Sequence, residues 1–123
     1  MTTLMRSDGS MRTPTTVPSV KRSSTSGADL LIHDAQYTDA EYPAKRTWGH
    51  SPMEYAVDLA ILAGVRHLAL FHHDPSRTDQ ALAQLVRRMC RRLRDHGSNL
   101  DVMAAADGLE IELPGILHAV GAI

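Results

Sequence analysis

Residues 50–74, HSPMEYAVDLAILAGVRHLALFHHD, contain the pattern that decides the fold. The stretch opens with Ser51 as a capping residue, followed by a proline and, three residues after the cap, a glutamate, which is typical of a helix start. Apolar side chains then recur at spacings of three and four until Gly64, which favours a helix with one buried face. From Val65 to Phe71 the run is almost wholly apolar, which predicts a strand covered on both faces.

Elements of the same kind flank this stretch. A short apolar run at residues 30–33 precedes it and favours a buried strand. A second amphipathic pattern follows it and predicts a helix that starts near Ser76 or Thr78 and ends at Gly97. Two further apolar runs are joined by Asp-Gly at residues 107–108, which predicts a β-hairpin. The order of strand, helix, strand, helix and hairpin is that of a layered α/β domain. The expected hairpin strands span residues 102–106 and 109–113.

The composition of the 123 residues, 43% hydrophobic and 22% charged, suits one small domain. Residues 1–26 are crowded with Ser and Thr, contain two prolines and show no periodicity, so we expect a flexible tail. The folded part then spans residues 27–113, and residues 114–123 form an apolar C-terminal extension without a pattern. A single cysteine allows no intramolecular disulfide and favours a reducing compartment such as the cytoplasm. No apolar run is long enough to span a membrane.

Charge divides along the same boundary, because the expected tail is basic and the remaining residues are acidic. The folded part therefore has no overall electrostatic attraction to nucleic acid. One cluster of basic residues lies within the second predicted helix, and helical spacing places it opposite the apolar stripe. Its members are Arg87, Arg88, Arg91, Arg92 and Arg94. A solvated outer face and a contact with a phosphate backbone both remain open, although no aromatic side chains lie among the arginines to stack on bases.

Polar groups gather where the two predicted strands end. Strands joined by a helix-containing crossover run parallel, so their C-terminal ends meet at one edge of the sheet. Three histidine-bearing segments converge there: His33-Asp34, His50, and His72-His73-Asp74. Open α/β sheets normally bind their ligands at this edge.

His50 stands immediately before the predicted helix. The positive end of a helix disfavours an imidazolium and attracts anions, so a neutral His50 could donate a hydrogen bond to a phosphate or a developing oxyanion. Asp34 could orient the ring. The alternative is that His50 only packs under Trp48 at the helix entrance.

Side chains alternate along a strand, so His72 and His73 cannot both point into one pocket, and one of them is structural. Taken alone, an adjacent pair of histidines is a weak metal signal.

Several of these segments, in this order, resemble a known family. They are residues 27–37, 48–51, 63–65, 68–75 and 104–109. Together they are similar to the C-terminal half of a metallo-β-lactamase-fold hydrolase, in the branch that includes ribonuclease Z and related phosphodiesterases. The resemblance covers about residues 27–113. It implies a four-layer αββα sandwich, of which this α/β chain is the C-terminal β-α-β-α-β-β half.

The resemblance also implies roles for individual residues. His50 matches a histidine that assists phosphodiester cleavage, and Asp34 matches the acid paired with it. His72 matches a ligand of a two-metal centre, usually zinc, at which a metal-bound hydroxide attacks a phosphodiester or an ester. We place His33, His73 and Asp74 around these groups as supporting residues.

One part of the family pattern is absent from this sequence. The main metal motif of the family, His-x-His-x-Asp-His, lies in an N-terminal half and does not occur here. Of the usual metal ligands only His72 remains, whereas a zinc centre requires three or four protein ligands. Half of a sandwich would also leave an apolar sheet face open, which predicts a complementary N-terminal half or self-association.

Two hypotheses follow from this departure. In the first, the chain is the truncated C-terminal piece of a metal-dependent hydrolase and is active when a complementary half supplies the metal motif. In the second, it is a non-catalytic binding or assembly module derived from that fold.

Overall fold

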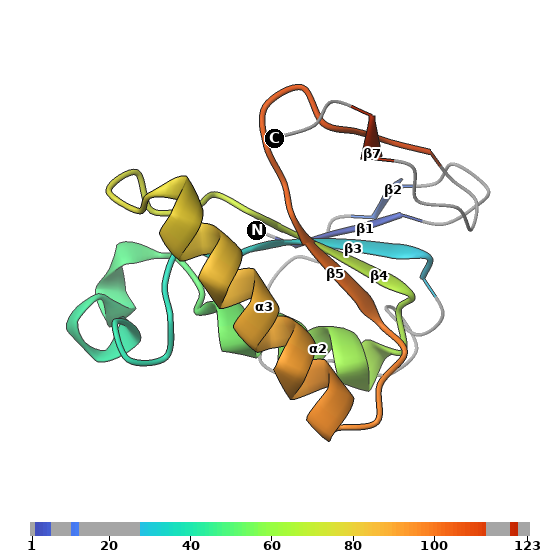
Figure 1. Cartoon of the computed structure of the whole chain (residues 1–123), viewed down its shortest axis with the longest axis horizontal. Coiled ribbons are helices and arrows are strands. Elements are labelled where there is room, and N and C mark those ends of the chain that lie inside the picture. Colours follow the sequence, from blue (N-terminus) through green and yellow to red (C-terminus); the bar gives the residue numbers. More distant parts are fainter. Residues whose placement is uncertain (1, 6–10, 13–27, 113–118, 121–123) are drawn as a thin grey trace.

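The computed structural model describes residues 2–5, 11–12, 28–112 and 119–120 (Figure 1). Its strands are β1 (Thr2–Met5), β2 (Met11–Arg12), β3 (Leu30–Asp34), β4 (His67–Phe71), β5 (Asp101–Ala104), β6 (Glu110–Ile111) and β7 (Ala119–Val120). Its α-helices are α2 (Met53–Ala63) and α3 (Asp79–Asp95), and two short 3₁₀ helices are η1 (Tyr42–Ala44) and η2 (Arg46–Trp48). None of these helices is long and apolar enough to cross a membrane.

The central sheet is built from β3, β4 and β5, which run parallel in that order. In the register, Leu31 lies beside Leu68, and Leu68 lies beside Val102. Each pair of neighbouring strands is joined through one helix, α2 or α3, as a parallel pair requires. The predicted α/β architecture and the parallel pairing of the first two strands are therefore confirmed.

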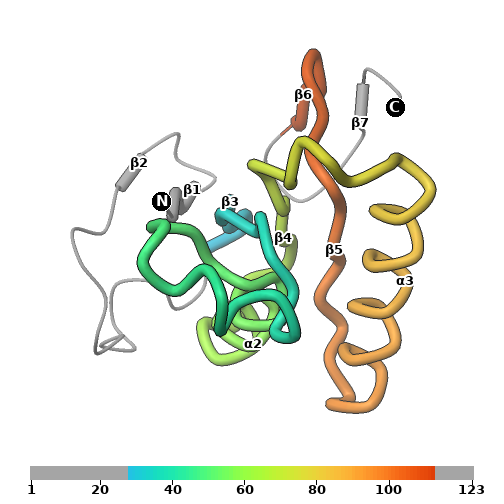
Figure 2. The backbone as a smooth tube through the Cα atoms, turned by 90° about the vertical axis from the view of Figure 1, so that its left-hand side faces the viewer, coloured from blue at the N-terminus to red at the C-terminus, as the bar shows by residue number. Residues whose placement is uncertain are grey.

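Both helices cover the same face of this sheet (Figure 1). Leu31, Leu68 and Leu70 alternate toward that face and form one core cluster with side chains of both helices. Figure 2 shows α3 alongside β5, with α2 beneath β3 and β4. Several helix positions that the spacing of three and four predicts are buried: Met53, Ala56, Val57 and Ala60 on α2, and Met89 and Leu93 on α3. Ile61, Leu82, Leu85 and Val86 are only partly buried, whereas α2 also buries Glu54, Leu59 and Ala63. Full burial of one such large apolar side chain contributes about 1.5–3 kcal/mol.

The expected flexible tail contains two short strands. β1 pairs antiparallel with β3, and β2 pairs antiparallel with β1, which extends the sheet to five strands. The prediction of no regular structure is thus wrong for residues 2–5 and 11–12, because β3 offers an edge of backbone groups that a neighbouring strand satisfies. The rest of residues 1–26, and most of the expected extension at 114–123, lie outside the described residues.

The predicted hairpin at Asp107-Gly108 is wrong. The turn itself forms: Gly108 has φ 81°, and the Leu109 N–H donates to the Ala106 carbonyl at 3.0 Å. However, β5 pairs with β4 in parallel, whereas β6 pairs with β7 in a separate two-stranded sheet. An Asp-Gly turn reverses the chain locally but does not specify the partner of the strand that follows it, and β6 pairs with β7 and not with β5.

The start of α2 differs from the predicted capping box. Pro52 is the N-cap, and no side chain caps the helix. In a capping box the Ser51 N–H would donate to the side chain of Glu54. Here it donates to Asp34 Oδ1 at 2.9 Å. The Glu54 carboxylate accepts from the Asp39 N–H at 2.9 Å and from Arg88 at 2.6 Å. Partners from distant segments have therefore replaced the local ones.

The arginine cluster is not a uniformly solvated face. Arg88 reaches Glu54, and Arg92 makes a two-pronged contact with Asp58 at 2.9 and 2.8 Å, so these two arginines tie α3 to α2. The other three, Arg87, Arg91 and Arg94, are exposed. The solvated-face interpretation holds for those three, whereas Arg88, although exposed, and the partly buried Arg92 also contact carboxylates of α2.

These two ties should differ in strength, because the Glu54 side chain is only 5% exposed and that of Asp58 is 43% exposed. We expect Glu54→Ala to lower the free energy of unfolding by about 2 kcal/mol, since it removes two hydrogen bonds of a buried carboxylate, one of them from a charged donor. Asp58→Ala, on the same helix and also facing an arginine, should cost below about 1 kcal/mol. Urea unfolding followed by circular dichroism measures both, and equal losses would contradict the burial argument.

Candidate functional site

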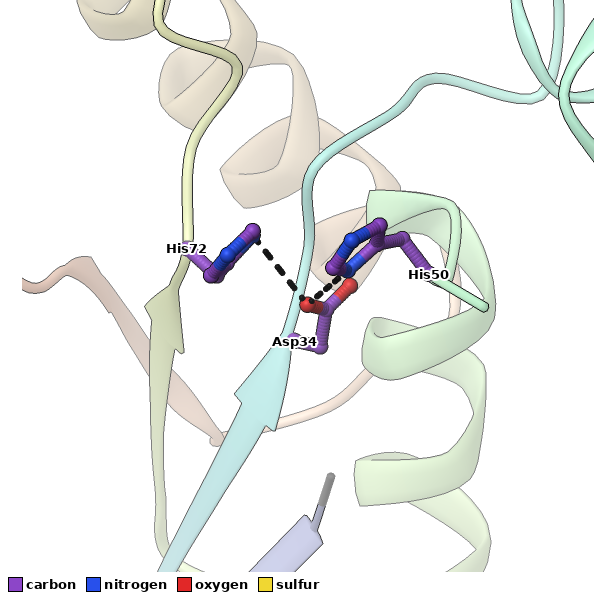
Figure 3. A group of neighbouring side chains, drawn as sticks. All are labelled: Asp34, His50 and His72. Atoms are coloured by element: carbon purple, nitrogen blue, oxygen red, sulfur yellow. Dashed lines mark hydrogen bonds and ion pairs between the residues drawn. The ribbon is translucent and has the colours of Figure 1, made fainter. Parts of the chain in front are cut away.

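Asp34, His50 and His72 come together at the edge where β3 and β4 end and α2 begins (Figure 3). One carboxylate oxygen and one nitrogen from each ring all lie within 4.8 Å of one another. Within the described part of the chain, this is the one group of three or more His, Cys, Asp or Glu side chains that could hold a metal ion. The convergence predicted from the strand–helix–strand order is found for these three residues.

The Asp34 carboxylate is the centre of the group. It is 3% exposed, and its Oδ1 accepts the Ser51 N–H at 2.9 Å. Its Oδ2 lies 2.8 Å from His50 Nδ1 and 3.5 Å from His72 Nδ1. A carboxylate only accepts hydrogen bonds, so His50 Nδ1 carries the hydrogen of this contact and Nε2 takes no part in it.

The two imidazoles lie face to face beside this carboxylate (Figure 3). The ring centroids of His50 and His72 are 4.4 Å apart, and the ring planes differ by 15°. His72 is the one non-glycine residue with a positive φ, 59°, in the described part of the chain. This left-handed backbone conformation is unfavourable for a residue with a Cβ, and such strain is commonly kept at functional sites.

Backbone contacts bring His50 to Asp34. After β3, the Ala35 N–H continues the pairing by donating to the Phe71 carbonyl at 2.9 Å. Tyr37 then forms a bridge with Pro52, and the Met53 N–H donates to the Tyr37 carbonyl at 2.7 Å. The loop after β3 is thereby held against the segment before α2, which places His50 beside the carboxylate.

The three expected supporting residues do not join the cluster. His33 is buried, and its Nδ1 bonds to the Asp34 carbonyl at 2.7 Å. His73 bonds through Nε2 to the Ala105 carbonyl at 3.2 Å. Burial lowers the pKa of both imidazoles. Asp74 accepts hydrogen bonds from the N–H and the hydroxyl of Ser76, which lower its pKa and hold the turn after β4.

Comparison with known proteins gives one consistent answer. The chain is 36% identical over 88 residues to the ribonuclease Z of Gemmatimonas aurantiaca, covering 70% of this chain and 25% of that protein. It is 43% identical over 60 residues to the ribonuclease Z of Lactococcus lactis, covering 49% of this chain and 20% of that protein. It is also 36% identical over 90 residues to the ribonuclease Z of Trichodesmium erythraeum, covering 72% of this chain and 26% of that protein.

The chain is related to ribonuclease Z. The resemblance to the ribonuclease Z branch of metallo-β-lactamase-fold enzymes is therefore confirmed. The chain spans about a fifth to a quarter of the length of the curated ribonuclease Z proteins it matches. No family model matches the chain.

Two further residues support the candidate site and were not assigned a role from sequence. Tyr37 is fully buried, its ring meets His50 edge-on at 6.0 Å, and burial raises the pKa of its hydroxyl. Arg77 binds both oxygens of Glu41, at 3.1 and 2.9 Å, and the Gln36 carbonyl at 3.0 Å. It ties the loop after β4 to the loop after β3. Neither role has a sequence signal, because both depend on contacts between loops.

The alternative placement of His50 under Trp48 is not found. The Trp48 side chain is 61% exposed, and within the described residues the ring contacts of His50 are with Tyr37 and His72. Imidazole nitrogens and a carboxylate oxygen are ligands that suit zinc. The donor set of the cluster therefore fits a divalent metal, with Asp34 already engaged by donors of the protein.

The strained backbone at His72 can be tested with matched pairs of substitutions. We expect His72→Gly to be more stable than His72→Ala by about 0.5–1 kcal/mol, because only glycine adopts a positive φ without penalty. At His73 the order should reverse, with alanine the more stable by a similar amount. Thermal or urea unfolding of the four variants measures these differences. If alanine were also the better residue at position 72, the backbone there would not be strained.

Proposed function

We propose that this chain provides the histidine–aspartate part of a metal-dependent phosphodiesterase site of the ribonuclease Z type. One observation carries the proposal: a single buried carboxylate faces the Nδ1 atoms of two stacked imidazoles, His50 and His72. Histidines that bind metals or move protons commonly have the second nitrogen held by a carboxylate in this way. Both Nε2 atoms are then available for chemistry.

Each residue has a distinct role in this proposal. His72 is a metal ligand through Nε2, and the metal is a divalent ion, with zinc the expected one. When bound, such an ion polarises a phosphoryl oxygen and activates water. His50 Nε2 holds or delivers a proton at the leaving oxygen of the phosphodiester, and Asp34 fixes the ring and stabilises its charged form.

The remaining metal ligands come, in this proposal, from a segment that the present sequence does not contain. In these roles His72 is the one metal ligand from the described residues, which is fewer than the three or four ligands that zinc takes in proteins. In this proposal that segment packs on the sheet face opposite the helices, where Ile32, Ala69 and Met103 lie in one row. A complementary half that carries a second sheet would complete the four-layer sandwich there. The single cysteine, half-buried on α3, suits a cytoplasmic setting for this function.

A chimeric enzyme tests the proposed function. The segment of Lactococcus lactis ribonuclease Z that matches this chain would be replaced by the sequence of this chain, so that the missing ligands are supplied. We expect metal-dependent hydrolysis of bis(p-nitrophenyl) phosphate. His50→Ala should lower the rate about a hundredfold or more, as loss of a general acid does.

His73→Ala is the matched control, because His73 neighbours the cluster in sequence but bonds elsewhere. It should leave most of the activity. Hydrolysis that is indifferent to His50→Ala and His72→Ala would contradict the catalytic roles. A folded chimera without activity would favour the non-catalytic assembly module.

Zinc binding by the chain alone tests the incompleteness of the site. We expect weak binding in competition with a chromophoric chelator, because the cluster supplies fewer ligands than a zinc site needs. His72→Ala should remove this binding and His73→Ala should preserve it. Tight, stoichiometric binding that is lost in His72→Ala would show that the site is complete without another segment.

A further inference from the structure

Trp48 is an exposed tryptophan beside the candidate site. It is the only tryptophan of the chain, and its side chain is 61% exposed. Tryptophan is normally buried over most of its surface, so an indole left in water calls for a reason. Trp48 stands two residues before His50, which limits the separation of their Cα atoms to about 7 Å. The indole is therefore carried by the same short segment as His50.

The backbone around Trp48 is well defined. Trp48 ends the 3₁₀ helix η2, and its N–H donates to the Lys45 carbonyl at 3.1 Å. Gly49 follows in the left-handed region, with φ 82°, and turns the chain between the exposed indole and the half-buried imidazole of His50. The turn lets two aromatic side chains of neighbouring positions occupy different surroundings, one in solvent and one in the cluster.

Lys45 links the indole to the site. Its Nζ lies 4.7 Å from the centroid of the Trp48 ring and 5.2 Å from that of the buried Tyr37 ring. Tyr37 in turn meets His50 at 6.0 Å. A cation over an aromatic face holds the ring in place, because the ring quadrupole attracts the charge. The indole is thus fixed in relation to His50 while most of its surface stays accessible.

The same loop also presents a positive charge to solvent. Arg46 lies two residues before Trp48 in η2 and is exposed, and no carboxylate of the described residues lies within ion-pair distance of it. An exposed aromatic ring next to a cation is the combination that binds unstacked nucleotides, with the base on the ring and the phosphate at the cation. The exposed arginines of α3 have no exposed aromatic residue among them, so this loop fits a nucleotide better than α3 does.

We propose that Trp48 is a stacking platform for a nucleobase of the substrate, and that Arg46 contacts a neighbouring phosphate. This inference rests on the proposed function, because a phosphodiester bound at His50 is what would place a base at the indole.

The fluorescence of Trp48 reports this binding directly in the full chain, since no other tryptophan contributes. Adenosine 5′-monophosphate should quench the emission in a saturable way. Ribose 5-phosphate, which has the same phosphate and no base, should not. Free N-acetyltryptophanamide provides the correction for absorbance and collisional quenching by adenine. Quenching no greater than that of the free indole, or equal effects of the two phosphates, would overturn the platform.

Variants separate the two contacts. By calorimetry, Trp48→Ala should weaken the binding of adenosine 5′-monophosphate about tenfold to a hundredfold, and Trp48→Phe should retain most of it, because stacking needs an aromatic face. Arg46→Gln should weaken the binding of adenosine 5′-monophosphate and leave the binding of adenosine unchanged. If Trp48→Ala folds normally and its affinity for adenosine 5′-monophosphate is unaltered, the proposal is refuted.

The outcomes also distinguish this inference from the proposed function. If nucleotide binding depends on Trp48 while the chimera shows no hydrolysis, the hydrolase proposal fails and the platform stands. If hydrolysis depends on His50 while Trp48→Ala leaves nucleotide binding intact, the platform fails and the hydrolase proposal stands. A blue shift of the emission with rising protein concentration, without nucleotide, would instead place Trp48 in a contact between copies of this chain and overturn the inference.

Discussion

The buried carboxylate of Asp34 is the interaction on which the site depends. One oxygen receives the N–H of Ser51, and the other lies between the Nδ1 atoms of His50 and His72. A carboxylate that is 3% exposed is stable only when donors surround it, because desolvation of an unpaired charge costs several kcal/mol. The donors come from the end of β3, from the start of α2 and from the end of β4. The charge therefore requires all three segments to be in place at once.

The site and the fold constrain each other through this contact. The Ser51 N–H that a helix would ordinarily give to its own cap is used by Asp34, and Glu54 is released to hold Asp39 and Arg88. The left-handed backbone at His72 is tolerated because it brings the imidazole over the carboxylate and against His50. Local preferences are given up where a distant partner offers a stronger hydrogen bond. This is the pattern expected at a functional site.

Sequence reasoning succeeded where one periodicity dominates. The apolar spacing of α2 and α3, the runs of β3 and β4, and the glycine at residue 64 all predicted elements that the structure contains. The meeting of His50, His72 and Asp34 followed from topology alone, because parallel strands end at the same edge. The hairpin prediction failed because Asp107-Gly108 specifies a turn and not the partner of the strand that follows it. The sequence could not show which arginines of α3 pair with carboxylates of α2, because these pairs depend on how the two helices pack together.

The sequence by itself determined the elements, their order and the edge at which the histidines gather, because these depend on the residue pattern and on chain connectivity. It also contained the motifs that relate the chain to ribonuclease Z. Only the tertiary structure decided that His73 bonds elsewhere, that Ser51 donates to Asp34, and that Trp48 stays in solvent over Lys45. Those outcomes depend on hydrogen bonds and ring contacts between loops far apart in sequence, for which no local pattern exists.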